Sequence, residues 1–213
     1  MGLSACSNTK KLAEDEVLLV KNKVVVHKPP AGVSNKKNFN DDLNDLVIQK
    51  TNKKLFGLFR LKLWFYMRTE DKKITKFRNW IRSSVGEPPA LLDEEKIGYS
   101  VTKMKTYLAN KGHFYGDIET DIAYKKKNKK AVVTYNIHPK LYYKFGPVHL
   151  PDGNSNIDKI IRANADDMLI SEGESFDADK LADERTRISE LLRNEGYFFF
   201  GNEYITFDLD STI

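Results

Sequence analysis

One stretch of this sequence occurs twice. Residues 107–114 read Tyr-Leu-Ala-Asn-Lys-Gly-His-Phe, and 84 positions later residues 191–198 read Leu-Leu-Arg-Asn-Glu-Gly-Tyr-Phe. At the same offset Asp93 falls on Asp177, and the apolar residues of one amphipathic helix fall on those of the other. Each copy predicts a helix that stops at a glycine and turns into an aromatic strand, because glycine readily adopts the left-handed conformation that ends helices. A repeat of this kind constrains the fold more than composition does.

The first copy belongs to a longer predicted unit. Residues 17–26 are rich in β-branched side chains and predict a strand pair or one interrupted strand. The run Asn40-Asp41-Asp42 is typical of a helix start, and a second helix is expected over 93–110. Residues 113–124 alternate between apolar and polar, and after a lysine-rich turn residues 131–137 return as a second strand. The lysines of that turn are expected to be solvated.

The second copy predicts the same order with one strand fewer. A strand is expected over 142–150, a short helix capped by Asn154 or Ser155, a longer helix over 177–194 and an aromatic strand over 197–209. The returning strand is absent, and we therefore expect the natural protein to continue beyond Ile213. The predicted fold class is α+β, with two tandem β-α-α-β-β units of which the second lacks its last strand. The expected domains are a tether at 1–13, unit 1 at 14–140 with an insertion at 51–85, and unit 2 at 141–213.

The insertion concentrates both positive charge and aromatic side chains. Residues 50–82 hold eleven Lys/Arg and two acids, a net charge of +9, whereas the rest of the chain is net acidic at −4. Residues 55–67 are dominated by Leu, Phe, Trp and Tyr. One interpretation is a helix that packs on unit 1 and solvates its basic side. The other is contact with anionic lipid or a partner protein, for which the candidate residues are Arg60, Lys62, Trp64, Tyr66 and Arg68.

The chain begins with a short motif of lipoproteins. Leu3-Ser4-Ala5-Cys6 matches a bacterial lipobox, in which the cysteine becomes the lipid-modified first residue, and a polar tether follows. Only Met1 and Gly2 precede it, where an apolar leader would stand. Myristoylation at Gly2 with palmitoylation at Cys6 and a free cysteine on a polar tail are the alternatives. With one cysteine the chain forms no internal disulfide, and no apolar run is long enough to span a membrane.

No pattern of catalytic or metal-binding residues emerges. The four histidines have neither the spacing nor the cysteine and carboxylate neighbours of a metal site, and no phosphate-binding loop or nucleophile motif is present. The paired acids at 41–42, 94–95 and 166–167 lie at or near predicted helix starts, where they complement the helix dipole. We therefore predict no enzyme, no catalytic residue, no metal and no cofactor.

The tandem order resembles the polypeptide-transport-associated (POTRA) domains that precede the barrel in outer-membrane assembly proteins of BamA and TamA type. The resemblance is carried by Gly86-Glu87-Pro88-Pro89, Asp93-Glu94-Glu95 and residues 107–114, with counterparts at Gly173-Glu174 and 191–198. With the lipobox, the chain is similar to the TamA-like lipoproteins of the Bacteroidetes group over about residues 6–213. It departs from a generic POTRA domain in the insertion at 51–85.

The resemblance implies a lipid-anchored periplasmic scaffold at the outer membrane of a Gram-negative bacterium. Its partners would be extended outer-membrane client polypeptides and a periplasmic or inner-membrane protein, with lipid held through Cys6. In such a sheet the first strand of the final hairpin lies at an edge and can accept an incoming strand; the corresponding residues here are Phe114, Tyr115, Ile118, Thr120 and Ile122.

Two other classes of function stay open. One is a membrane-anchored lipoprotein that binds a partner without any barrel. The other is a basic nucleic-acid-binding module that uses residues 50–82 and the lysine turn, with Phe59, Trp64 and Tyr66 as stacking residues. Against the second, the acidic remainder would repel phosphate, and we expect no nucleic-acid partner.

Overall fold

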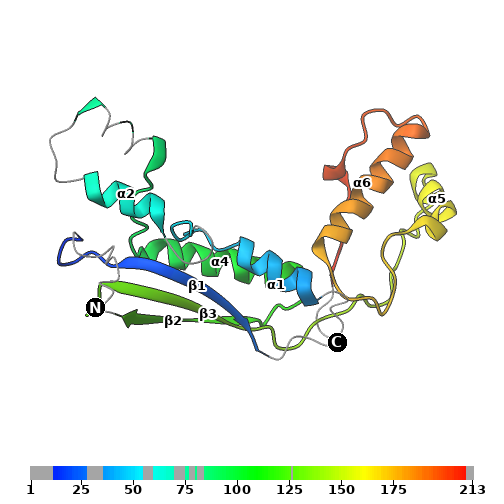
Figure 1. Cartoon of the computed structure of the whole chain (residues 1–213). Helices are drawn as coiled ribbons and strands as arrows, with labels where there is room; N and C mark the ends of the chain where they lie inside the picture. Colours follow the sequence, from blue (N-terminus) through cyan, green and yellow to red (C-terminus); the bar gives the residue numbers. More distant parts are fainter. Residues whose placement is uncertain are drawn as a thin grey trace. The chain divides into compact units, whose positions relative to one another are not determined.

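A computed structural model describes residues 12–27, 36–54, 60–69, 75–76, 80, 84–125 and 127–209. The elements in chain order are β1 (Leu18–Val26), α1 (Lys36–Asp45), α2 (Leu61–Thr69), α4 (Glu94–Asn110), β2 (Asp117–Lys125), β3 (Lys130–His138), α5 (Asn156–Ala163), η2 (Ala165–Asp167), α6 (Ala178–Asn194) and η3 (Asn202–Tyr204) (Figure 1). They form two compact units. Unit 1 holds the described residues up to Thr106 together with Asp117–Pro139, and unit 2 holds Tyr107–Gly116 and the described residues from Lys140 onward.

Unit 1 is built on a three-stranded sheet in the order β1-β3-β2. β3 lies in the middle, parallel to β1 and antiparallel to β2. Between β1 and the hairpin lie α1, α2 and α4, and α2 belongs to the insertion at 51–85, so the order is β-α-α-β-β with one added helix, which confirms the α+β prediction. Residues 17–26, expected as a pair or one interrupted strand, form a single strand whose register with β3 shifts between Leu19 and Lys21.

The core of unit 1 lies between one face of the sheet and the helices on that side (Figure 1). Alternate residues of β3 are fully buried, as the period of two predicts: Ala131, Val133, Tyr135 and Ile137. Leu43 of α1 and Met104 of α4 are likewise fully buried. The Ser100 hydroxyl links α4 to the segment after α1, because it donates to Lys96 O at 2.7 Å and accepts from Ile48 N at 3.0 Å.

One helix start differs from the prediction. α1 begins at Lys36, so Asn40, Asp41 and Asp42 lie inside the helix and not at its N-terminus. The apolar stripe explains the earlier start, because Phe39 and Leu43 are four residues apart and both buried. The other predicted helix starts are confirmed: Asp93 Oδ1 accepts from Lys96 N at 3.1 Å, and Ser155 forms a capping box with Asp158 on α5.

The repeat is reproduced bond for bond at the ends of α4 and α6, which are each 17 residues long. His113 N donates to Leu108 O at 2.8 Å, and Tyr197 N donates to Leu192 O at 3.0 Å. Gly112 and Gly196 have φ angles of 82° and 98°, as the predicted helix stops require. The same offset of 84 relates both pairs.

The repeat also extends upstream of the helices. In unit 1, Leu19 N donates to Ala90 O at 2.8 Å and Leu92 N donates to Val17 O at 2.7 Å. In unit 2 the equivalent bonds run from Phe145 N to Glu174 O at 2.8 Å and from Phe176 N to Tyr143 O at 2.9 Å. Each unit therefore holds its first extended segment antiparallel to the residues just before its long helix.

The strands expected in unit 2 do not form. Of the segment 142–150 only Lys144 makes a bridge, to Ser175. Residues 197–209 contain the 3₁₀ turn η3 and no strand. A strand requires a neighbour for its N–H and C=O groups along its length. In 142–150 the backbone bonds to Gly112 and to residues 173–176 reach only Tyr143 and Phe145, and among the described residues the backbone of 197–209 bonds only to residues close in sequence. Among the described residues, no helix is both long and apolar enough to cross a membrane.

Candidate strand-edge site

The two edges of the unit 1 sheet differ in how far other segments cover them. The outer edge of β1 is covered at its beginning by residues 90–92, through the backbone bonds at Leu19 and Leu92. Just beyond, the Arg60 guanidinium donates to Val20 O at 2.6 Å. Asn22 of the same strand donates its amide to Gln49 O at 2.7 Å. This edge is therefore closed over its first half by segments of unit 1 itself.

Two buried amide side chains hold the covering segment in place. Asn52, 3% exposed, donates to Pro88 O at 2.7 Å and accepts from Ala90 N at 2.9 Å. Gln49, 8% exposed, donates to Leu91 O and accepts from Asp93 N at 3.3 Å. Each side chain pairs with backbone as a neighbouring strand would, so residues 88–93 are fixed although they form no regular strand.

β2 is the open edge. All nine of its residues pair with β3, and no other described segment pairs with it. Ile118 is buried, Ile122 is half-buried and Thr120 is exposed. Phe114 and Tyr115, which the sequence placed at the start of this strand, lie in the turn before it, since β2 begins at Asp117. The predicted edge residues within the strand are thus Ile118, Thr120 and Ile122.

The pairing register sorts the side chains of β2 onto two faces. Ile118, Thr120, Ile122 and Tyr124 pair with the fully buried residues of β3 and so share the face that the helices cover. Asp117, Glu119 and Asp121 pair with His138, Asn136 and Thr134 and share the opposite, uncovered face. Asp117 forms an ion pair with Lys105 at 3.1 Å, and Asp121 accepts from the Asn136 amide at 2.7 Å.

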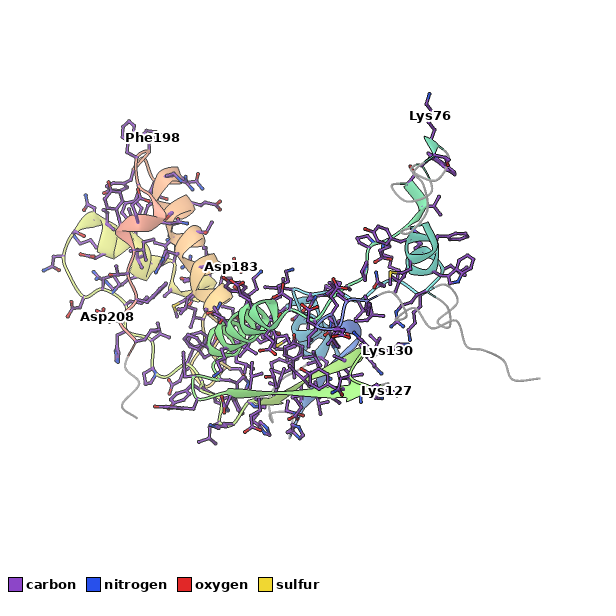
Figure 2. All side chains as sticks on the ribbon, turned by 90° about the vertical axis from the view of Figure 1, so that its left-hand side faces the viewer. Lys76, Lys127, Lys130, Asp183, Phe198 and Asp208 are labelled. Carbon is purple, nitrogen blue, oxygen red and sulfur yellow. The ribbon has the colours of Figure 1, made fainter. Side chains whose placement is uncertain are left out.

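The hairpin end of β2 is basic. Lys127 and Asn128 both have positive φ, at 53° and 62°, which gives the tight turn between the strands. Lys127 is exposed and lies with Lys130 at the tip of the hairpin (Figure 2). Lys129 is not simply solvated as predicted, because its ammonium group donates to the carbonyls of Ala13 and Glu14.

The turn before β2 belongs to an aromatic cluster in unit 2. The ring of Phe114 lies 5.3 Å from that of Tyr143 and 5.2 Å from that of Phe176. Tyr115 hydrogen-bonds Tyr143, and this bond raises the pKa of the Tyr143 hydroxyl. Phe114 and Tyr115 are therefore packing residues of unit 2 at least as much as candidates for binding a partner.

The aromatic segment of the insertion is only partly accessible. In α2 Leu63 and Met67 are buried in a cluster with Leu18, and Tyr66 packs against that cluster. Trp64 is half-buried and Lys62 is exposed. Burial lowers the pKa of the Arg60 guanidinium, with the charge of Glu87 acting in the opposite direction. Residues 55–59 and the Arg68 side chain lie outside the described residues.

Cys6 also lies outside the described residues. Within the described ranges, no group of three or more His, Cys, Asp or Glu residues is placed to hold a metal ion. His27 and His138 stack with ring centroids 4.6 Å apart on the uncovered face, and His27 Nε2 lies 3.1 Å from Asn136 Oδ1.

Sequence reasoning missed two parts of this site. It placed Asp117, Glu119 and Asp121 on one face of a strand but assigned that face no role; the period of two was the available signal. The sequence also did not indicate that Gln49 and Asn52, which follow α1 in an irregular segment, hold the segment that covers β1. No local pattern marks an amide that bonds backbone 36 or 42 residues away.

The sheet and helices of unit 1 define a class of domain. A parallel β1-β3 pair, an antiparallel β2-β3 hairpin at one edge and helices on one face form a β-α-α-β-β unit of POTRA type. The POTRA family model, described as "Surface antigen variable number repeat", matches residues 68–140, about a third of the chain. This match supports a POTRA region within the chain.

A comparison of structures finds POTRA domains 3–5 of BamA from Haemophilus influenzae, with a TM-score of 0.38 and 10% sequence identity. The match covers 85% of this chain, which spans about half (51%) of that structure. No curated protein matches the sequence significantly.

Proposed function

We propose that this chain is a non-catalytic periplasmic scaffold of an outer-membrane assembly or translocation barrel, and that it binds extended polypeptides along β2. The single observation that carries the proposal is the asymmetry of the unit 1 sheet. The β1 edge is covered over its first half by residues 90–92 and Arg60, whereas no described segment pairs with the β2 edge.

The physics of an open edge supports this function. An edge strand presents N–H and C=O groups that an incoming extended segment can pair with in either direction. Backbone bonds supply affinity that is largely independent of sequence, which suits a scaffold that handles many clients. The POTRA match over residues 68–140 includes β2 and β3. We further propose that the bound segments are extended outer-membrane client polypeptides, that a periplasmic or inner-membrane protein is a second partner, and that the chain serves a barrel.

Hydrogen exchange with a bound peptide tests strand addition. The probe is a nine-residue extended peptide matched in length to β2. On binding, the outward-facing amides of β2 should exchange more slowly, while the amides of β3, already paired on both sides, should not change. A photo-reactive residue in place of exposed Thr120 should cross-link to the peptide, and one in place of Thr134 on the central strand should not. Protection confined to another part of the chain would contradict the assignment.

The same proposal places the chain at the periplasmic face of the outer membrane, anchored through Cys6. Two or more acyl chains are needed for stable anchoring, and the lipobox chemistry provides them on one cysteine. Mass spectrometry of the protein purified from bacterial membranes should show an acylated N-terminal Cys6. An unmodified thiol behind an intact leader would refute the anchor while leaving strand addition untouched.

A second candidate function is contact of α2 with anionic lipid. The exposed Lys62, the half-buried Trp64 and Trp80, which is 55% exposed, favour it. Arg60 and Tyr66 contribute less, because both are engaged within unit 1. Flotation of protein lacking Cys6 with liposomes that contain or lack anionic lipid tests whether α2 contacts lipid or only packs within unit 1. Flotation that depends on lipid charge supports membrane contact, and its absence leaves α2 a structural helix.

A further inference from the structure

The uncovered face of the unit 1 sheet is divided by charge. Lys21 and Lys23 of β1 share this face with Val132 and Thr134 of β3, and Asp121 of β2 shares it on the other side. The face is therefore basic along one edge strand and acidic along the other. The acidic side is the side on which β2 is open, so an added strand meets Asp117, Glu119 and Asp121 there, and meets a lysine, Lys125, only at the hairpin end of β2.

The acids of β2 are available to an added strand to different degrees. Asp117 is neutralised in part by Lys105, as described above. Asp121 accepts one hydrogen bond from a neutral amide, and no ion pair to it is formed within the part of the chain that the structure describes. Glu119 is exposed and lies between them on the same face. Glu119 and Asp121 thus present two carboxylates to the position directly opposite on a neighbouring strand.

The helix-covered face of β2 favours apolar side chains on an added strand. Ile122 is half-buried and Tyr124 is 47% exposed, although both are aligned with fully buried residues of β3. These side chains are apolar surface at the rim of the core. An added strand would cover them with its own side chains on that face, and apolar residues gain most from doing so.

We propose that the open edge of β2 selects extended segments in which Lys or Arg alternates with apolar residues. The inference rests on the proposed function, because it presumes strand addition at β2. Side chains directly opposite each other on neighbouring strands stabilise the pair when their charges are opposite and destabilise it when they are alike. A period of two in the client places its basic residues on the face of Glu119 and Asp121 and its apolar residues on the face of Ile122 and Tyr124.

Three nine-residue peptides test the selection. They alternate valine with lysine, with threonine or with glutamate, and they are labelled for fluorescence anisotropy. Two cross-strand pairs should favour the lysine peptide over the glutamate peptide roughly tenfold in Kd, with the threonine peptide between them. The preference should shrink as salt is raised, since exposed charges are screened.

Matched charge reversals locate the selection on β2. Glu119→Lys with Asp121→Lys should invert the order of the three peptides. Lys21→Glu with Lys23→Glu changes charge by the same magnitude on the same face but at the other edge strand, and should keep the order. If the reversed β2 does not fold, Glu119→Gln alone should still reduce the lysine preference severalfold, because it removes one of two charges.

The outcomes separate this inference from the proposed function. Inversion by the β2 reversal alone supports the selection. Equal binding of all three peptides, with slowed exchange at β2, overturns the selection and leaves strand addition standing. Inversion by the β1 reversal overturns the placement of the selecting charges. No binding of any peptide overturns strand addition at β2 and the selection with it.

Discussion

The ammonium group of Lys111 lies 2.8 Å from Oδ2 and 2.9 Å from Oδ1 of Asp177, the residue that caps α6. Asp179 in the first turn of α6 also accepts from Lys111, at 2.8 Å. Asp93, the counterpart of Asp177 in the repeat, pairs with Lys96 of its own helix. The same aspartate thus caps a helix in both copies but serves a second, longer-range contact only in unit 2, where it ties the residue after α4 to the start of α6.

Replacement of Lys111 by methionine should destabilise unit 2 by about 0.5–1 kcal/mol, the range of partly exposed ion pairs. Burial acts to lower the pKa of Lys111, but the bonds to Asp177 and Asp179 outweigh it and raise the pKa above the ordinary 10.5. Stability from a raised lysine pKa is fully present below the ordinary value and is lost as pH rises through the folded one. The urea midpoint should therefore fall more in the parent than in Lys111→Met above pH 10.5. Parallel pH profiles would contradict the linkage.

Gly112→Ala and Gly196→Ala should show how much stability is lost to backbone strain and how much to steric crowding. Both have positive φ, so each substitution costs about 1–2 kcal/mol of strain. A Cβ at Gly112 would also lie 3.1 Å from Phe176 Cβ and 3.2 Å from Tyr143 O, whereas one at Gly196 meets nothing within 4 Å. Thermal unfolding should show a larger loss for Gly112→Ala than for Gly196→Ala. Equal losses would mean that Phe176 moves aside freely.

The repeat made the helices and their stops predictable because they depend on local chemistry. A capping aspartate, a stripe every three or four residues and a glycine at the left-handed position all act within a few residues of one another. The sheet of unit 1 was predictable for the same reason, through the alternation in β3 and the lysine turn. Strand bounds were less so, because Phe114 and Tyr115 continue the alternation and yet turn away to pack on Tyr143 and Phe176.

Long-range polar contacts were beyond sequence reasoning. Glu184 is 2% exposed, holds Arg187 through two hydrogen bonds and accepts from Leu169 N at 3.0 Å. In the sequence it is one acid among many in a charged helix, and only the approach of Leu169 makes it a core residue. The strand predicted at 197–209 failed for a related reason, because a strand depends on a partner that composition does not reveal.

Phe114→Ala and Phe198→Ala, at equivalent positions of the repeat, should measure how much the aromatic cluster around Tyr143 and Phe176 stabilises unit 2. Phe114 is 47% exposed and contacts two rings, whereas Phe198 is 76% exposed and projects outward beyond α6 (Figure 2). Phe114→Ala should lower the stability of unit 2 by about 1–2 kcal/mol, since aromatic pairs add to the burial of area. Phe198→Ala should stay within about 0.5 kcal/mol of the parent in the same urea titration. A loss at Phe198 as large as that at Phe114 would show a contact that the described residues do not contain.

Removal of the Asn52 amide should loosen the cover on β1. Asn52→Leu leaves Pro88 O and Ala90 N without their side-chain partners, and a buried unsatisfied group costs about 1–3 kcal/mol. Exposed Asn44→Leu, which loses one bond to Asn40 O, is the matched control and should cost less. In Asn52→Leu the amides of Leu19 and Leu92, which bond across this segment, should exchange faster, while that of His27, bonded to Ile137 O, should not. A second open edge invites pairing between chains, so this variant should also self-associate as concentration rises. Unchanged exchange at Leu19 would show that backbone pairing alone keeps the β1 edge closed.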